Sequence, residues 1–562
     1  MVTNSHTIAP KVRQKLAPSS IIFLFLGAGI PLLFLTIFFA WPVLNMVRLG
    51  FIGDGTDTMG SFVQAWEVFT RPRTLRVIGQ TLLQALLATA ISGLLGMPLA
   101  FVLYKLRFRG VQTLRALVIV PFVLPTVVVG LAFRSLYQKN GLLGFLDLDG
   151  TLIAIISALV FFNISVVVRT VGVSWQNLDP RMEQAAATLG ANPFHVFLSV
   201  TVPRLLPSLL SALSIVFLFC ATAFGVVLTM GGLSYGTVET EIYLLTVHFL
   251  DLPGASVLSI VQFLVVIVVL MIVSRTRKKR ERSQKEVASI AAVRKPKKQD
   301  TPLIVLGIAV GFLLLLPILN LFLRSLKVGS EYSFQNYFKL GEIQPGIGVS
   351  IWQALWNSVE TAALASFLAL LIGILAALTL NRLQQRHPKI GDLLDNLIML
   401  PLGISSVTVG LGFLITLNQP PFDLRTSPIL VPIAQALVAL PLVIRIILPV
   451  LNRINQKLRQ SAMVLGASPA RVLLDIDLRL ALRPIAAAGV FAFAVSLGEF
   501  GATVFLARPD RPTMPVMIYR LMSKPGVESF GMAIAASIVL VLATILVAAL
   551  VEKIQKGASG VF

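Results

Sequence analysis

Twelve long apolar stretches run through this sequence, each bounded by charged or turn-forming residues. About 20 consecutive apolar residues cross a bilayer as a helix, and each stretch reaches roughly that length. The pattern therefore predicts an all-α polytopic membrane protein with about 12 transmembrane helices. The predicted spans are 21–46, 80–104, 113–137, 151–173, 206–231, 254–274, 302–326, 357–381, 391–417, 428–450, 482–507 and 530–551.

The spans fall into two sets of six that share sequence. At an offset of 276 residues, Gln184–Leu198 aligns with Gln460–Leu474, and eight of these 15 positions are identical. The same register aligns Tyr243 with Tyr519. Because each set has an even number of spans, the repeats are parallel and related by an axis along the membrane normal. We therefore expect two pseudo-symmetric halves around one translocation path.

A basic segment joins the two halves. Residues 275–300 contain eleven Lys or Arg but only three acids, which predicts a solvated linker. The predicted division is an N-terminal tail (1–20), a first transmembrane domain (21–274), the linker (275–300), a second transmembrane domain (301–552) and a C-terminal tail (553–562).

Composition and charge agree with a membrane protein. The chain is 56% hydrophobic and 13% charged, whereas soluble proteins carry about a quarter charged residues. A net charge of +22 would suggest a nucleic-acid partner in a soluble protein. With the N-terminus in the cytoplasm, however, most basic residues fall in the tails, the linker and the loops after even-numbered spans. The positive-inside rule thus explains the charge by orientation, with both termini cytoplasmic and no nucleic acid expected.

Residues that could hold a metal or a catalytic centre are sparse. The one cysteine, Cys220, lies inside an apolar run, and the four histidines are scattered, so we expect neither a metal site nor a disulfide framework. The sequence contains no Gly-Lys-Ser/Thr phosphate-binding loop. An intramembrane enzyme is disfavoured because no catalytic set recurs within the spans, and we expect this chain to bind no cofactor.

The repeated segment forms a semi-polar loop after the fourth span of each half, near 174–205 and 451–481. In the first loop, Asp179 before a proline suits a helix start. Gly190 suits a left-handed helix end, and Asn192 before another proline starts the next segment. One such loop could be a connector on the membrane surface. Two copies with the same Gly-x-x-Pro spacing favour a docking element that meets two identical partners.

These loops resemble the EAA motif of the permease subunits of binding-protein-dependent ABC importers. In that motif Glu-Ala-Ala is followed by a glycine and then by a hydrophobic-Pro pair. The first copy reads Gln184-Ala185-Ala186, Leu189-Gly190 and Val202-Pro203, with Glu183 preceding it. The second copy reads Gln460-Ser461-Ala462 and Leu465-Gly466, with Leu478-Arg479 in place of the hydrophobic-Pro pair. The resemblance covers nearly the whole chain as two fused permease domains.

The resemblance implies a fold, a location and partners. It implies a type I ABC importer permease in the cytoplasmic (inner) membrane of a prokaryote, with each loop forming a coupling helix in a cleft of an ATP-binding subunit. Two copies of that subunit would hydrolyse ATP, and an extracytoplasmic solute-binding protein would deliver the solute. The coupling residues that it implies are Glu183, Gln184, Ala185, Ala186, Gly190, Pro203, Gln460, Ser461, Ala462 and Gly466.

Charged residues within the spans are candidates for the substrate path, because a charge in the membrane is costly. Glu499 lies in span 11 at the position of Ala223 in the other half. Glu499 either forms a hydrogen bond between helices or lines the path of a cationic substrate. Glu360 is the second candidate. It lies near the outer end of its span, as does Arg134, where long side chains more often anchor a helix at the interface.

The region after span 5, residues 224–232 and 237–243, resembles fused thiamine-importer permeases. Iron(III) importers use the same fused design, so we interpret the solute as thiamine, with iron(III) as the alternative. Glu239, Glu241 and Asp251 agree with a cationic cargo and equally with ordinary outward placement of acids. A secondary transporter with parallel six-helix repeats is the rival from another class, but it would not explain the duplicated loop.

Replacing Gly190 by leucine is expected to uncouple transport from ATP hydrolysis, because Gly190 is the expected pivot of the first coupling helix. The measurement compares ATP-driven solute uptake with ATP hydrolysis in the assembled transporter. Transport at the wild-type rate with a firmly bound ATPase would contradict this role.

Overall fold

The computed structural model describes residues 18–52, 58–232, 235–281, 293–329, 331–343, 346, 348–417, 423–424 and 426–556. Ten helices in these residues are long and apolar enough to cross a membrane, and two bent helix pairs bring the number to twelve. Apart from helices, the described residues form one small hairpin of β1 (Lys327–Val328) and β2 (Glu331–Tyr332). The predicted all-helical membrane fold is confirmed.

The helices of the two halves follow the same order from the second long helix of each half onward. The first half comprises α1 (Pro18–Leu35), η1 (Thr36–Ala40), α2 (Trp41–Val47), η2 (Arg48–Ile52), α3 (Thr58–Thr70), α4 (Pro72–Lys105), α5 (Val111–Val123), α6 (Thr126–Tyr137), η3 (Gly144–Leu146), α7 (Leu152–Gln176), α8 (Arg181–Thr188), α9 (Pro193–Val196), η4 (Phe197–Thr201), α10 (Val202–Ala221), α11 (Gly225–Met230), α12 (Val238–Val247) and α13 (Leu252–Glu281). The second half comprises η5 (Lys298–Asp300), α14 (Thr301–Ser325), α15 (Gln335–Phe338), η6 (Lys339–Gly341), α16 (Ile351–Arg386), α17 (Pro388–Met399), η7 (Leu400–Gly403), α18 (Ser406–Thr416), α19 (Leu430–Arg453), α20 (Gln456–Val464), α21 (Pro469–Val472), η8 (Leu473–Leu478), α22 (Arg479–Leu497), α23 (Thr503–Leu506), α24 (Met514–Ser523) and α25 (Val527–Lys556).

In each half, two long helices pack against each other more extensively than any other pair. These pairs are α4 with α7 and α16 with α19. A Cβ placed on Gly96 would lie 2.7 Å from Cγ1 of Val167, and one on Gly373 would lie 2.7 Å from Cγ1 of Val443. Glycine therefore permits the same close approach of backbones at both crossings, as small residues do in membrane helix pairs. The repeat seen in the sequence is thus a repeat of packing.

Four predicted spans are broken rather than continuous. In place of 113–137, α5 and α6 meet at 101°, and in place of 391–417, α17 with η7 and α18 meet at 93°. The first break has a local cause, since Leu124 precedes a proline and adopts extended backbone. The predicted span 206–231 likewise ends as α10 at Ala221, and the short helix α11 follows. The predicted span 482–507 ends as α22 at Leu497, and the short helix α23 follows.

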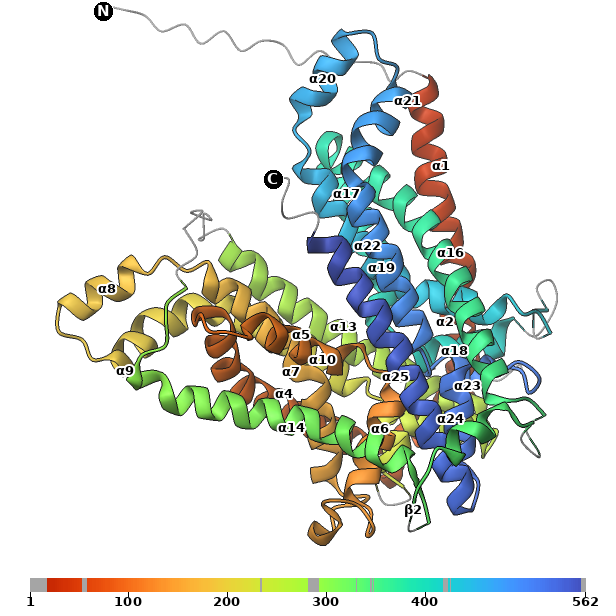
Figure 1. Cartoon of the computed structure of the whole chain (residues 1–562). Helices are drawn as coiled ribbons and strands as arrows, with labels where there is room; N and C mark the ends of the chain where they lie inside the picture. Colours follow the sequence, from red (N-terminus) through yellow and green to blue (C-terminus); the bar gives the residue numbers. More distant parts are fainter. Residues whose placement is uncertain are drawn as a thin grey trace, which may run out of the picture.

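The first helix of each half packs against the other half (Figure 1). The helix α1 lies along α16, and α2 packs on α18. In the same way α14 lies along α4 and α6. The first helix of each half therefore packs on the other half, and the largest buried cluster combines residues of both halves.

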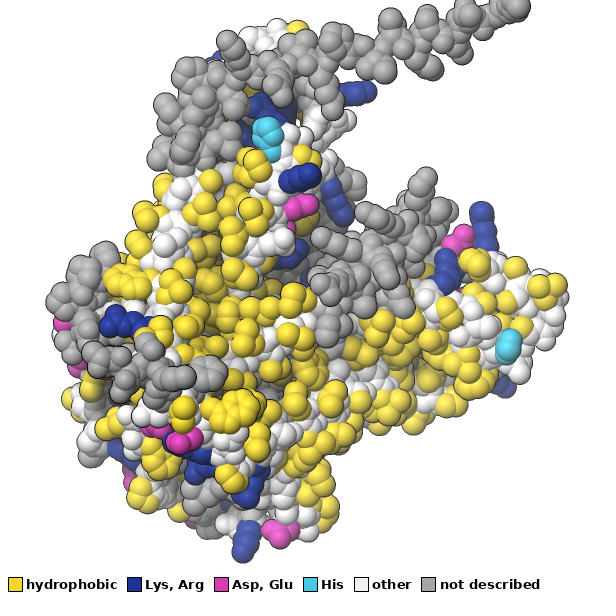
Figure 2. Space-filling model, turned by 180° about the vertical axis from the view of Figure 1, so that it is seen from behind, with side chains coloured by type: hydrophobic (Ala, Val, Ile, Leu, Met, Phe, Trp, Pro, Cys, Tyr) yellow, Lys and Arg dark blue, Asp and Glu magenta, His cyan; other side chains and the backbone are white. Residues whose placement is uncertain are grey.

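The two halves form two arms that meet at one end and diverge at the other (Figure 1). The arms converge around α6, α23 and α24, while α8–α9 and α20–α21 lie at their far ends. Hydrophobic side chains cover the flanks of both arms, with charged side chains gathered near the ends (Figure 2). The exposed Phe312 on α14 and Leu546 on α25 belong to these flanks, which suit contact with lipid.

The end of the linker is docked on the first half. The Arg107 N–H donates to the Arg294 carbonyl at 2.9 Å, and the Arg294 N–H donates to the Lys105 carbonyl at 3.0 Å. The Arg294 guanidinium makes two hydrogen bonds to Asp300, of 2.6 and 2.7 Å. Residues 293–300 thus run beside the first half and lead into α14, and residues 294–298 are exposed. Residues 275–281 continue α13, and 282–292 lie outside the described residues.

Breaking this ion pair is expected to lower stability in a pH-dependent way. The Arg294 guanidinium holds the pKa of Asp300 below its ordinary value. A lowered carboxyl pKa stabilises the folded state above the unfolded pKa, and this contribution disappears as the pH falls through the lowered folded pKa. We expect Arg294→Gln to cost about 1 kcal/mol near neutral pH and little in acid, measured as thermal unfolding in detergent against pH. Arg508→Gln, which opens the exposed pair with Asp510, is the control and should cost less; an equal loss at all pH values would contradict the pair's role.

Candidate functional site

Each repeated loop folds into a pair of short helices at the far end of its arm. In the first loop, Asp179 Oδ1 accepts a hydrogen bond from the Arg181 N–H at 2.9 Å, and Asn192 Oδ1 accepts one from the His195 N–H at 2.7 Å. The predicted starts of α8 and α9 are confirmed. The second loop is started in the same manner by Asn455 and Ser468.

A left-handed glycine turns the chain between the two short helices of each loop. Gly190 has φ +85° and Gly466 has φ +87°, a conformation that side chains other than glycine adopt at a cost. The residue after each glycine donates its N–H to a carbonyl five residues earlier, Ala191 to Ala186 and Ala467 to Ala462. This is the Schellman-type helix end predicted for Gly190, and it recurs in the second loop.

The exposed surface of the loops is apolar at one repeated position. Leu189 is 89% exposed and Leu465 is 86% exposed, each directly before the turn glycine. Further exposed apolar residues surround them: Met182, Phe194, Leu458, Met463 and Val464. Apolar surface this open at the tip of an arm suits a protein partner. Sequence reasoning used the two leucines only as motif spacing, and their near-complete exposure is a property of the fold.

The predicted coupling residues divide between the outer and inner faces of the loops. Those on the outer, exposed face are Gln184, Ala185, Gly190, Gln460, Ser461 and Gly466, and Pro203 is exposed in the first turn of α10. Ala186 and Ala462 are half-buried on the inner face. Glu183 also faces inward, where its carboxylate has a specific partner.

An equivalent side-chain pair holds each loop to the helix that follows it. In the first half, the Thr201 hydroxyl donates to Glu183 Oε1 at 2.9 Å. In the second half, residues at the same offset of 276 form an ion pair, in which Arg459 Nε donates to Asp477 Oδ1 at 2.7 Å. We call these two pairs the loop braces. They join α8 to η4 and α20 to η8, which lead into α10 and α22.

The two halves contact each other through aromatic rings where the arms converge. Phe224 stacks on Phe500 with ring centroids 5.5 Å apart, and Tyr243 lies edge-on to Tyr519 at 6.4 Å. Tyr243 also meets Phe505 at 5.6 Å. Because the first two contacts each join residues 276 positions apart, the pseudo-symmetry axis passes between them. We call Phe224, Phe500, Tyr243, Tyr519 and Phe505 the axial aromatic cluster.

The short helices that carry the cluster are anchored equivalently in both halves. Thr81 Oγ1 on α4 accepts a hydrogen bond from the Val238 N–H at 3.0 Å, at the start of α12. Ser358 Oγ on α16 accepts one from the Met514 N–H at 2.6 Å, at the start of α24. Each anchor satisfies a backbone donor at a helix start that would otherwise have no partner within its helix.

The two predicted path acids occupy different surroundings. Glu499 is buried, and its two carboxylate oxygens accept hydrogen bonds from the Ala502 and Thr503 N–H groups at 2.8 and 3.1 Å. It therefore caps α23, next to Phe500 of the axial aromatic cluster. Glu360 is half-exposed and pairs with Arg511 at 2.7 Å, so the structure does not bring the two acids together.

Arg134, the third charged residue predicted within a span, lies against the neighbouring short helix. Its guanidinium donates to the Thr229 carbonyl of α11 at 3.3 Å. This contact fixes α6 to α11 and fits the anchoring interpretation of Arg134.

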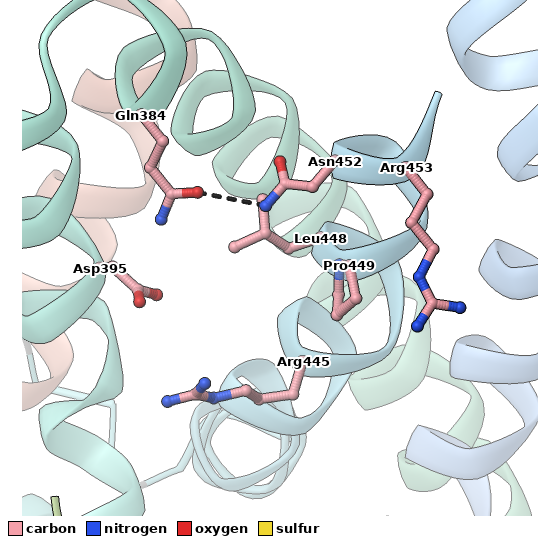
Figure 3. Close-up of a pocket in the computed structure, with 7 residues that line it drawn as sticks. All are labelled: Gln384, Asp395, Arg445, Leu448, Pro449, Asn452 and Arg453. Carbon is pink, nitrogen blue, oxygen red and sulfur yellow. Dashed lines mark hydrogen bonds between the residues drawn. The ribbon is translucent and has the colours of Figure 1, made fainter. Parts of the chain in front are cut away.

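A cavity of about 410 Å³ opens in the second half between α16, α17 and α19 (Figure 3). Asp395 and Arg445 point into it, and the Asn452 side-chain amide donates to Gln384 Oε1 at 3.3 Å. In the first half, the ring of Tyr104 packs against Gly172. None of the predicted site residues lines this cavity, and the described residues hold no cluster of three or more His, Cys, Asp or Glu suited to a metal ion.

Comparison with known proteins identifies the family. The family described as the binding-protein-dependent transport system inner membrane component matches this chain twice, over residues 92–282 and 369–559. The chain therefore belongs to this family, as a fused two-domain permease subunit with the type I ABC permease fold. It is a polytopic inner-membrane protein that works in transport with a binding protein and an ATP-binding subunit.

Several relatives match along the chain. The thiamine transport system permease protein ThiP of Haemophilus influenzae is 29% identical over 83% of this chain and 86% of that protein. ThiP of Escherichia coli is 26% identical over 82% of this chain and 86% of that protein. The sulfate transport system permease protein CysT of Escherichia coli is 34% identical, but over only 35% of this chain and 75% of that protein.

Replacing the Arg459–Asp477 pair of the second loop brace by the Glu–Thr pair of the first is expected to preserve the coupling of transport to ATP hydrolysis. Arg459→Glu alone places a carboxylate against the buried Asp477, and removing one partner of a buried ion pair costs about 3–5 kcal/mol; we expect transport to be lost. Arg459→Glu combined with Asp477→Thr restores a hydroxyl–carboxylate brace and should recover most of the transport. ATP-driven uptake and thermal stability in detergent are the measurements.

The outcome that would contradict the loop braces is simple to recognise. If the single variant Arg459→Glu couples as well as wild type, or if the double variant is no better than the single one, the brace does not transmit motion. Arg471→Gln, which opens the exposed pair with Asp475 in the same loop, is the matched control and should transport normally.

Proposed function

We propose that this permease subunit forms the translocation path for thiamine in an ATP-driven ABC importer. The observation that carries the proposal is the match with thiamine permeases along more than four-fifths of the chain, across both halves and the linker. The sulfate permease matches only 35% of the chain, which makes sulfate the weaker candidate.

The paired loops support two copies of an ATP-binding subunit, one beneath each half. Both loops present the same exposed leucine before the same left-handed glycine, so two identical clefts could receive them. ATP is bound and hydrolysed in those separate chains, and this chain binds no cofactor. The glycines act as pivots and the loop braces carry the motion into α10 and α22.

Orientation follows from this assignment. The loops meet the ATP-binding subunits in the cytoplasm, together with both termini and the basic linker. The axial aromatic cluster then faces the extracytoplasmic side, where a binding protein delivers the solute. The arms are apart at the loop end (Figure 1), and Phe224 and Phe500 are in contact where the arms converge. This arrangement supports an inward-open state.

Alternating access follows from the two-arm shape. ATP-driven approach of the two ATP-binding subunits brings the loops together, and rigid arms joined by first helices that each pack on the other half turn about their junction. The same rotation separates Phe224 from Phe500 and opens the path to the outside. Release of the hydrolysis products returns the arms to the open-inward position, where thiamine leaves into the cytoplasm.

The proposal is tested with the full chain reconstituted in vesicles with its ATP-binding subunit and binding protein. We expect uptake of radiolabelled thiamine to require ATP and to persist when the ion gradients are collapsed by ionophores. Uptake that follows the ion gradient without ATP would instead identify a secondary transporter. Uptake of iron(III) or sulfate, but not of thiamine, would overturn the assignment of thiamine as the solute. Substituting both Leu189 and Leu465 by serine should reduce transport by lowering affinity for the ATP-binding subunit.

A further inference from the structure

A buried carboxylate lies next to the axial aromatic cluster and is not used by the coupling machinery. Glu239 is in the first turn of α12 and is fully buried. Its Oε2 accepts a hydrogen bond from the Ser405 hydroxyl at 2.8 Å. Its Oε1 accepts no hydrogen bond from the described residues. A buried carboxylate oxygen without a partner is costly, and such atoms call for an explanation.

The position of Glu239 places it at the contact between the halves. Tyr243 follows it by four residues on the same helix, so both side chains lie on one face of α12. Tyr243 belongs to the axial aromatic cluster, and Ser405, which precedes α18, belongs to the second half. Glu239 therefore lies one helical turn from the rings and touches both halves.

Neither the repeat nor local pairing explains this acid. At the offset of 276, the second half has Pro515, so the fold does not require an acid here. The two neighbouring acids are already paired: Glu241 with Arg73 at 2.7 Å and Asp251 with Arg71 at 3.6 Å. Glu239 enters no ion pair within the described part of the chain. Its carboxyl group is thus available to a cation from outside the protein, which would favour the ionised form.

The geometry points to a recognition site for the cationic ring of the solute, made by Glu239 and the axial aromatic cluster and formed when the path opens outward. This inference rests on the proposed function. Thiamine carries a permanently cationic thiazolium ring beside a flat aminopyrimidine. Aromatic faces attract such a cation, and a desolvated carboxylate pairs with it.

Outward opening exposes both components of the site together. Separation of the halves parts Phe224 from Phe500 and Tyr243 from Tyr519, which exposes ring faces on both sides of the path. It also breaks the bond from Ser405, so that both oxygens of Glu239 can face the solute. Arg520 on α24 places a positive charge near Tyr243. This charge would repel a cationic solute unless a carboxylate such as that of Glu239 balanced it. The closed state covers the site with its own rings.

The test uses the complete transporter in vesicles and compares Glu239→Gln with Glu241→Gln. Glutamine at 239 keeps the acceptor for Ser405 but removes the charge. We expect Glu239→Gln to reduce the maximal rate of thiamine uptake at least tenfold, while ATP hydrolysis stimulated by the loaded binding protein stays within twofold of wild type. Glu239→Asp should recover part of the rate. Glu241→Gln, on the same helix but already paired with Arg73, should leave uptake within twofold.

Three outcomes would overturn the inference. If Glu239→Gln took up thiamine at the wild-type rate, the charge of Glu239 would not be needed for recognition of the solute. A parallel loss of uptake, stimulated hydrolysis and thermal stability would make Glu239 a structural link between the halves. If wild type carries thiamine, either result leaves the proposed function intact; if wild type carries only a neutral or anionic solute, the proposed function and the inference both fail.

Tyr243 gives an independent check on the aromatic part of the site. Tyr243→Phe keeps the ring face and should transport normally, whereas Tyr243→Leu should lower uptake several-fold and raise the KM for thiamine-loaded binding protein. Equal uptake by the two variants would show that the ring face is not needed.

Discussion

Backbone groups inside a membrane need hydrogen-bond partners, and this requirement shapes the centre of the molecule. Both α10 and α22 stop within the protein, and each leaves helix-end carbonyls there. Gln84 donates to the Cys220 carbonyl at 3.0 Å, and Gln435 donates to the Ser496 carbonyl at 3.0 Å. The helix starts that follow are satisfied by Glu499, Thr81 and Ser358. Broken helices are therefore tolerated at the contact between the halves because polar side chains from neighbouring helices complete them.

Equivalent contacts lie at equivalent positions in the two halves, but the residue types that make them often differ. The glycine crossings and turn glycines are the same residue type in both, because a close backbone approach or a left-handed turn leaves little choice. The loop braces are a hydroxyl with a carboxylate in one half and a guanidinium with a carboxylate in the other. The carbonyls at the helix breaks are satisfied from α4 in one half and from α19 in the other. A pair that only has to hold two elements together can change its members so long as the distance is kept.

This difference between the halves matters for function, because the two halves contribute different residues to the path of a single solute. Glu239 and Glu499 each occur in one half only, since Pro515 and Ala223 stand at the equivalent positions. The symmetric parts of the chain move the arms, whereas the unique residues near the axis provide the chemistry that distinguishes one solute from another.

The sequence by itself determined the apolar spans, the two halves and the loops with their helix starts and turn glycines. These features depend on local periodicity and on residues whose backbone preference acts within a few positions. Only the tertiary structure decided that four spans are broken, that the first helix of each half packs on the other half, and that Leu189 and Leu465 are exposed. It also decided that Glu499 caps a helix while Glu239 keeps an unpartnered oxygen beside the rings. The physical reason is that these outcomes depend on contacts between residues up to hundreds of positions apart, and an acid in a sequence does not indicate which backbone or side chain will reach it.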